Sequence, residues 1–210
     1  MNFTNIVLES FIAESVGKSL LLLDIDDTLL TASGIHIYRK LPTDKKEVPL
    51  TPDEYAKEIV TADTKKHYDY REFDDPKKIE ASITKGTPIW KNLALMDSHI
   101  KRGWEIGILT ARGFEDVIFS AMQKWLMFKN DAGLNPIGKK LTRSLVKAVN
   151  DRAKMYPGAT DFEKKANVIR KLSKKYDKIK FLDDDPKNIQ AVQKLAKDEN
   201  IKVLAVTAQV

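Results

Sequence analysis

Short apolar runs alternate along most of this chain with segments in which apolar residues recur every three to four positions. The runs predict strands over residues 19–23, 104–109, 144–149, 179–182 and 201–206. The helical period predicts helices over about 4–16, 113–128, 161–175 and 186–197. The third of these helices also has a start signal, since Thr160 to Glu163 fits a capping box. Strands that alternate with helices predict an α/β fold with a doubly wound parallel sheet and right-handed crossovers.

Residues 32–88 interrupt this rhythm with five prolines and many charges. Apolar residues at 35, 37, 48 and 50 predict a short hairpin there. Thr51-Pro52-Asp53-Glu54 predicts a helix with proline at its first position. The segment is too long for a plain loop between two core strands. We therefore predict a core formed by residues 1–31 and 89–210, with residues 32–88 as an inserted cap.

Composition narrows the class of protein. The 210 residues are 42% hydrophobic and 31% charged, as in an ordinary globular protein that buries a core. The chain has no cysteine, which excludes disulfides and thiolate metal sites, and its three scattered histidines do not predict a zinc site. No apolar run approaches the roughly 20 residues of a membrane span, and the amino-terminal residues lack the early basic run of a signal peptide. We expect a soluble, cytoplasmic protein with no membrane partner.

The strongest chemical signal follows the first predicted strand. Four consecutive leucines, 20–23, lead into three acids within four residues: Asp24, Asp26 and Asp27. Two like charges about 4 Å apart repel by roughly 4 kcal/mol at an effective dielectric constant near 20. A cluster of this kind at the end of a buried strand persists when it shifts its pKa values or holds a cation. Both outcomes indicate chemistry.

Other polar groups follow the later strands. Thr110 and Ala111 lead from the second strand into a helix and offer a hydroxyl and backbone N–H groups, which suit a phosphate. Asp183-Asp184-Asp185 follows the fourth strand, and Lys164-Lys165 lies in the first turn of the helix before it. Sites in parallel sheets lie beyond the carboxyl ends of the strands, so we expect these groups to converge. Carboxylates, a hydroxyl, oriented N–H groups and an ammonium suit magnesium-assisted phosphoryl transfer.

These residues resemble the motifs of the haloacid dehalogenase (HAD) superfamily, whose members are mostly phosphatases. Asp24-Ile25-Asp26-Asp27-Thr28 matches its Asp-x-Asp-x-Thr motif, and Ile108-Leu109-Thr110 matches its strand ending in Thr or Ser. A lysine at a helix start and acids after a strand follow in the family's order. The resemblance covers about 17–33 and 89–206. It implies a sheet of order 5-4-1-2-3, hydrolysis of a phosphomonoester and a requirement for Mg²⁺.

The resemblance also implies roles for individual residues. Asp24 is expected to be the nucleophile that forms an aspartyl-phosphate, and Asp26 to protonate the leaving oxygen and then activate water. Thr110, Ala111 and the lysine are expected to bind the phosphoryl oxygens. The Asp24 carboxylate, the Asp26 backbone carbonyl and one acid of the fourth motif are expected to hold the metal.

Three positions leave alternatives open. Asp27 stands where the family often has glycine. Its side chain is expected either to point outward or to act as a partner of the neighbouring acids. Lys165 shares a helix face with apolar residues and is favoured over Lys164 as the phosphate lysine. Asp184 is favoured over Asp183 as metal ligand, with Asn188 where another acid often follows, and Asp185 is expected to cap the next helix.

The net charge of +6 is unevenly placed. Residues 121–180 contain 16 Lys and Arg against 5 Asp and Glu, a net of +11, and the rest of the chain has a net of −5. This basic region predicts either solvated helix faces or a surface for a phosphorylated or polyanionic substrate.

The substrate classes are therefore a nucleotide or nucleic-acid terminal phosphate, or a small phosphorylated metabolite. A binding protein that keeps the fold without turnover is the third alternative, against which the intact Asp24/Asp26 pair argues. The oligomeric state stays open.

Overall fold

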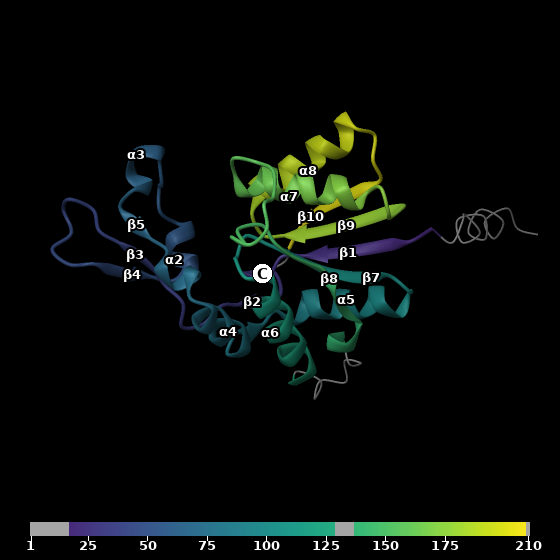
Figure 1. The fold of residues 1–210 in the computed structure, drawn as a ribbon, viewed down its shortest axis with the longest axis horizontal. Helices are drawn as coiled ribbons and strands as arrows, with labels where there is room; N and C mark the ends of the chain where they lie inside the picture. Colours follow the sequence, from purple (N-terminus) through teal and green to yellow (C-terminus); the bar gives the residue numbers. More distant parts are fainter. Residues whose placement is uncertain (1–16, 129–136, 209–210) are drawn as a thin grey trace, which may run out of the picture.

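A five-stranded parallel sheet forms the centre of the chain, which a computed structural model describes over residues 17–128 and 137–208 (Figure 1). Its strands are β1 (Ser19–Leu23), β7 (Glu105–Thr110), β8 (Leu141–Ala148), β9 (Lys178–Asp183) and β10 (Val203–Thr207). They lie in the order β10-β9-β1-β7-β8, which is 5-4-1-2-3 when these strands are counted along the chain. The predicted α/β class with a parallel sheet is confirmed. The helix predicted over 4–16 lies outside the described residues.

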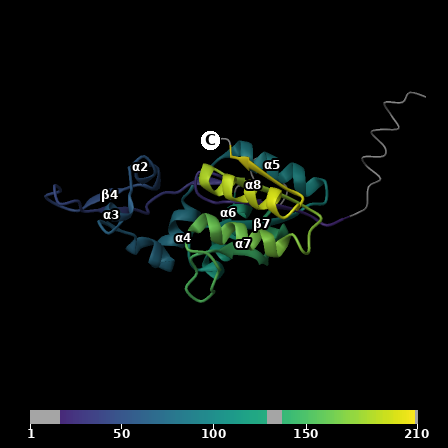
Figure 2. The same cartoon turned by 90° about the horizontal axis from the view of Figure 1, so that it is seen from above.

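Two layers of helices cover this sheet, as Figures 1 and 2 show. One layer contains α5 (Trp90–Lys101) and α6 (Glu115–Phe128), and the other contains α7 (Asp161–Leu172) and α8 (Pro186–Asp198). The leucines of β1 alternate between the layers: Leu21 and Leu23 join the first core, and Leu20 and Leu22 the second. All four are fully buried, and each such side chain stabilises the fold by about 1.5–3 kcal/mol.

The starts of two helices explain why the sequence predicts one of them and not the other. At α7 the Thr160 side chain accepts from the backbone of Glu163, and the Glu163 side chain accepts in return from the backbone of Thr160, so the predicted capping box is confirmed. Helix α5 was not predicted, and its N-cap residue is Ile89, whose side chain makes no capping hydrogen bond. Without a polar cap the sequence carries no start signal there. Strand β8 begins three residues before the predicted strand, and its pairing with β7 shifts in register between Leu141 and Val146.

A small lobe, defined here as residues 36–70, has its own sheet and core. Strands β3 (Ile37–Arg39), β4 (Val48–Leu50) and β5 (Tyr68–Asp69) are antiparallel in the order β4-β3-β5, with helices α2 (Pro52–Ala56) and α3 (Ala62–Lys65). The predicted hairpin and the predicted helix with proline at its first position are both present. Ile37, Leu50 and Tyr68 form the lobe's core. Figure 1 shows the lobe beyond the carboxyl ends of the central strands, and in Figure 2 it again lies to one side of the core.

The rest of the predicted insertion packs on the main core. It comprises the 3₁₀ helix η1 (Arg71–Asp74), helix α4 (Pro76–Thr84) and strand β6 (Thr87–Pro88), which pairs with β2 (Leu30–Thr31). Ile79 and Ile83 of α4 are fully buried in the same cluster as Leu21 and Leu23. A further 3₁₀ helix, η3 (Ile137–Lys140), precedes β8. Helix α4 is therefore anchored to the core, whereas the lobe is not part of that cluster.

The helices within 17–128 and 137–208 include no segment with both the length and the apolar character needed to cross a bilayer.

Candidate active site

A tight turn after β1 presents the first acid cluster at the carboxyl edge of the sheet. The backbone N–H of Asp24 donates to the carbonyl of Leu182 in β9 at 2.9 Å, which continues the strand pairing by one residue. The carbonyl of Ile25 then accepts from Leu29 and Leu30, at 2.9 and 3.1 Å. Within this turn Asp27 has a φ of 48°, in the left-handed region that glycine and short polar residues tolerate. That backbone conformation explains why glycine also suits the position.

Asp24 and Lys165 form a buried ion pair. Lys165 on α7 is 1% exposed, and its Nζ lies 3.2 Å from Asp24 Oδ1 and 2.7 Å from Asp183 Oδ2. Burial raises the pKa of the Asp24 carboxyl well above its ordinary value, against the lowering effect of Lys165, and the neighbouring acids raise it further. Burial lowers the pKa of Lys165, but the two carboxylates outweigh it and raise that pKa, so the ammonium stays charged.

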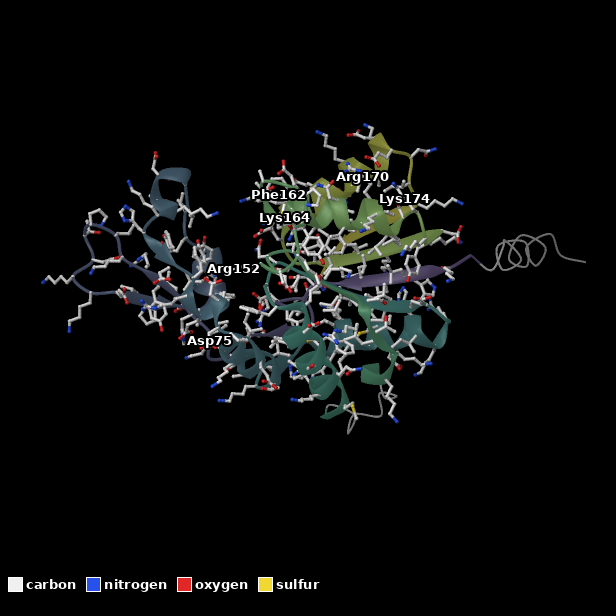
Figure 3. The ribbon with its side chains drawn as sticks, viewed as in Figure 1. Asp75, Arg152, Phe162, Lys164, Arg170 and Lys174 are labelled. Carbon is white, nitrogen blue, oxygen red and sulfur yellow. The ribbon has the colours of Figure 1, made fainter. Side chains whose placement is uncertain are left out.

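Lys164, the alternative phosphate lysine, lies elsewhere. Its Nζ donates to Asn150 Oδ1 at 2.6 Å and lies 3.8 Å from Asp161 Oδ1. In Figure 3 Lys164 and Phe162 mark the end of α7 nearer the lobe, whereas Arg170 and Lys174 lie toward its other end. Of the two lysines, the structure therefore brings Lys165 to the acid cluster, as the helical period predicts.

Asp183 and Asp184 differ in how their carboxyl groups are held. Asp183 Oδ1 accepts from the Asp185 backbone N–H at 3.0 Å and from Asn188 Nδ2 at 2.8 Å, and its Oδ2 accepts from Lys165. Asp184 is only partly buried, and burial together with the charge of Asp183 raises its pKa to about 7. Asp185 caps α8 by accepting from the Lys187 backbone N–H at 2.8 Å, so the predicted capping role is confirmed.

These acids fit a divalent cation. Asp24, Asp183 and Asp184 each offer a carboxylate oxygen, and the three oxygens lie within 4.8 Å of one another. The Oδ1 of Asp24 is buried and accepts no hydrogen bond from the described residues, although Lys165 lies beside it. Clustered carboxylate oxygens are the donor set that hard cations such as Mg²⁺ prefer, and the pKa values of Asp24 and Asp184 are both raised. A metal ion is therefore the group that these residues suit.

Asp26 is held by an arginine whose role the sequence did not predict. Arg112, 3% exposed, donates from Nε to Asp26 Oδ2 at 2.8 Å and from Nη2 to Asp26 Oδ1 at 2.7 Å. Its Nη1 donates to the Ser82 hydroxyl of α4 at 2.7 Å. Burial lowers the pKa of Arg112, but Asp26 and Asp24 outweigh this and raise it, so the guanidinium stays charged. Arg112 follows Thr110 by two positions, in the loop that the sequence predicts to bind a phosphate through its hydroxyl and backbone N–H groups, and that prediction assigns no role to the arginine side chain.

Thr110 and Ala111 lie where the second strand leaves the sheet. Thr110 is the last residue of β7 and is 1% exposed, and its hydroxyl accepts from the Arg112 backbone N–H at 3.3 Å. The Ala111 carbonyl accepts from Asn150 Nδ2 at 2.6 Å, which fixes the direction of the loop. Because β7 is the neighbour of β1, both residues lie at the same sheet edge as Asp24.

Many basic side chains of residues 121–180 already face acids. Eight of them lie within 4.0 Å of a carboxylate oxygen: Lys124, Arg143, Lys147, Arg152, Lys154, Lys164, Lys165 and Arg170. One of these pairs, Arg152 with Asp74 at 2.7 Å, joins the core to η1, and Figure 3 shows Arg152 on the side of the core that faces the lobe. The net charge of +11 therefore overstates the positive surface that is free to attract a polyanion.

Comparison with known proteins gives weak structural similarity. The sequence matches no protein-family model and no curated protein. Among solved structures, the HAD domain of effector protein Lem4 from Legionella pneumophila is similar at 12% identity, with 91% of this chain and 85% of that chain covered and a TM-score of 0.43. The L. pneumophila effector Ceg4 is similar at 12% identity, with 93% and 88% covered and a TM-score of 0.44. At these values the case for function rests on the residues around Asp24.

Proposed function

We propose that this protein is a HAD-type, magnesium-dependent phosphomonoester hydrolase that acts through an aspartyl-phosphate on Asp24. The observation that carries the proposal is the set of charged groups around the Asp24 carboxylate. Lys165 from α7 and Asp183 and Asp184 from the end of β9 converge on it at the carboxyl edge of a parallel sheet. Two further groups lie at the same edge. Thr110 ends the neighbouring strand β7, and Asp26 follows Asp24 by two residues.

Charge balance supports the metal. Four acids (Asp24, Asp26, Asp183 and Asp184) face two cations (Lys165 and Arg112), which leaves a formal charge of −2. Asp24, Asp184 and the Asp26 backbone carbonyl would hold a divalent cation, with Asp183 oriented by Lys165 and Asn188. When bound, Mg²⁺ supplies positive charge next to the phosphoryl oxygens.

The chain's own residues then account for both chemical steps. In the first, an Asp24 oxygen attacks phosphorus, the bond to the leaving oxygen breaks, and Asp26 gives that oxygen a proton. In the second, Asp26 takes a proton from water, whose oxygen attacks phosphorus, so that inorganic phosphate leaves and the Asp24 carboxylate is restored. Lys165, the Thr110 hydroxyl and the Ala111 backbone N–H stabilise the charge on the phosphoryl oxygens.

The substrate class is proposed in two forms. In the first, the lobe and the basic region bind a nucleotide or a nucleic-acid terminal phosphate, and in the second the lobe closes over a small phosphorylated metabolite. The position of the lobe beyond the carboxyl edge supports a cap function in both forms (Figure 1). The extensive pairing of basic side chains with acids favours the small metabolite, because paired cations attract a polyanion less.

The deciding experiment measures phosphate release from 4-nitrophenyl phosphate, from small phosphate esters and from a 3′-phosphorylated oligonucleotide, with magnesium and with EDTA. Release should require magnesium and be lost in Asp24→Asn. Asp97→Asn is the matched control, since Asp97 is also a buried acid but lies on α5, outside the acid cluster. Absence of release from every ester with magnesium would reject hydrolysis and favour a binding protein of this fold. Full activity of Asp24→Asn would reject its role as nucleophile.

A further inference from the structure

Helix α4, which belongs to the inserted segment, reaches the proposed catalytic pair through one hydroxyl. Ser82 is fully buried, donates its own proton to the Ile79 carbonyl at 2.9 Å, and accepts from Arg112 Nη1 at 2.7 Å. The other two nitrogens of the same guanidinium, Nε and Nη2, each donate to one oxygen of Asp26. A single planar group thus joins Ser82 to Asp26.

Because the guanidinium is rigid and planar, its contact with Ser82 constrains how it meets the Asp26 carboxylate. Its donors form a rigid fork, so the position of Nη1 sets the plane in which Nε and Nη2 meet the Asp26 carboxylate. The fork occupies two of the roughly four lone-pair sites of that carboxylate, so the others can still carry the proton that the reaction moves. Ser82 therefore acts on the orientation of Asp26 without contacting it.

Helix α4 is fixed firmly enough to serve as the reference for this orientation. Ile79 and Ile83 are fully buried in the main core. Just beyond the helix, the Gly86 carbonyl accepts from the Trp125 indole N–H of α6 at 3.1 Å. On the exposed side Lys124 of α6 lies 2.9 Å from Glu80. The middle of the helix that carries Ser82 and the segment just beyond its carboxyl end are thus held against α6.

We propose that Ser82 is a positioning residue, through which the inserted segment aligns Asp26, by way of Arg112, for proton transfer to the leaving oxygen. This inference rests on the proposed phosphatase function. It assigns to residues 32–88 a part in the chemical step in addition to a part in substrate binding.

The leaving group provides a test that a purely structural role would not satisfy. An alkyl phosphate needs a proton on its leaving oxygen, whereas 4-nitrophenyl phosphate releases a stable anion and depends little on a general acid. In Ser82→Ala, Arg112 Nη1 loses its acceptor, and kcat for an alkyl phosphate should fall about tenfold with KM little changed. The kcat for 4-nitrophenyl phosphate should stay within about twofold.

The ratio of the two kcat values is the decisive quantity, because any loss of folded protein cancels in it. Thr84→Ala is the matched control: Thr84 lies on the same helix and donates to its backbone at 3.0 and 3.2 Å, but it is exposed. Its ratio should equal that of the wild type. In an Arg112→Ala background, Ser82→Ala should not change the ratio further, since the link to Asp26 is already broken.

The outcomes separate the two proposals. An active wild type whose ratio is the same in Ser82→Ala overturns the positioning role and leaves the phosphatase intact. The same holds if both substrates slow equally, or if Thr84→Ala changes the ratio as much. A wild type that hydrolyses neither ester with magnesium overturns the proposed function, and the positioning role with it.

Discussion

Replacing Asp184 by Asn should change how stability depends on pH in the metal-free protein. Burial, reinforced by the charges of Asp183 and Asp27, raises the pKa of Asp184 to about 7 in the folded state. In the unfolded chain an Asp titrates near 3.9. Between these values the folded state binds more protons than the unfolded state, so the free energy of unfolding rises as pH falls. This is opposite to the usual effect of a salt-bridged carboxylate.

The size of the effect follows from the same two pKa values. Lowering the pH from about 8 to about 5 should stabilise the wild type by about 3 kcal/mol at most through this group alone, and by less to the extent that solvent screens the partly exposed carboxylate. Asp184→Asn removes the contribution and should also make the protein more stable at pH 8, where a partly buried negative charge is lost. The difference in unfolding free energy between variant and wild type should therefore shrink steadily toward pH 5.

Other titrating groups make the comparison with the variant necessary. Burial lowers the pKa of His99, and a histidine of this kind costs stability as pH falls below about 6.5. The lowered pKa values of Glu72, Asp116 and Glu163 cost stability only at more acidic pH, below about 4.5. These groups are present in both proteins and cancel in the difference. The raised pKa of Asp24 does not cancel fully, because the charge of Asp184 contributes to it. Loss of that charge in Asp184→Asn lowers the pKa of Asp24 and flattens the pH profile of the variant in the same sense.

The assay is urea denaturation of both proteins in EDTA at several pH values between 5 and 8. Parallel stability profiles would refute the reasoning, because they would mean that Asp184 titrates at its ordinary pKa in the folded state. Adding magnesium gives an internal check. A metal ligand must be deprotonated, so the stabilisation by magnesium should grow with pH in the wild type and be much smaller in Asp184→Asn.

Three further predictions use the same stability and activity measurements. Lys165→Met should lower the free energy of unfolding by about 3–5 kcal/mol, because it leaves two buried carboxylates without their cation. Lys164→Met should lower it by less than about 1 kcal/mol. Equal losses would contradict the assignment of Lys165, and not Lys164, to the acid cluster. Asp185→Ala should cost about 1 kcal/mol through loss of the α8 cap and leave phosphate release unchanged, and a loss of activity would place Asp185 in the site. If the substrate is a nucleic-acid terminal phosphate, KM for the oligonucleotide should rise steeply between about 50 and 200 mM salt, and a flat response would favour a small metabolite.

The core was predictable because its signals are local. Buried runs such as Leu20–Leu23 and a start signal such as Thr160–Glu163 can each be recognised within a few residues. Helix α5 lacks such a signal at Ile89, and the pairing of β2 with β6 joins two-residue strands that have no periodicity of their own. These elements form because their apolar residues pack on the core, and the local sequence pattern does not show which segments will pack there.

The candidate site was likewise predictable where its signals are local, and not where residues far apart in the sequence meet. The helical period distinguishes Lys165 from Lys164, since it describes which residues share a face. No period links Arg112 to Asp26, which lies 86 positions away, or to Ser82, which lies 30 positions away. The sequence shows Arg112 only as a residue after Thr110, and its partners depend on how α4 docks beside α6.

The contacts of Asn188 explain how three acids in a row, Asp183 to Asp185, can stand at the end of β9. An acid at position 188 would bring another negative charge to Asp183, whereas the amide donates to Asp183 Oδ1 at 2.8 Å. With Lys165 and the Asp185 backbone N–H, this gives the fully buried Asp183 three donors, which is the condition under which a buried carboxylate is tolerated. The uncompensated negative charge is then concentrated on Asp24 and Asp184. These are the two carboxylates whose pKa values are raised, and therefore the two that gain most from a divalent cation.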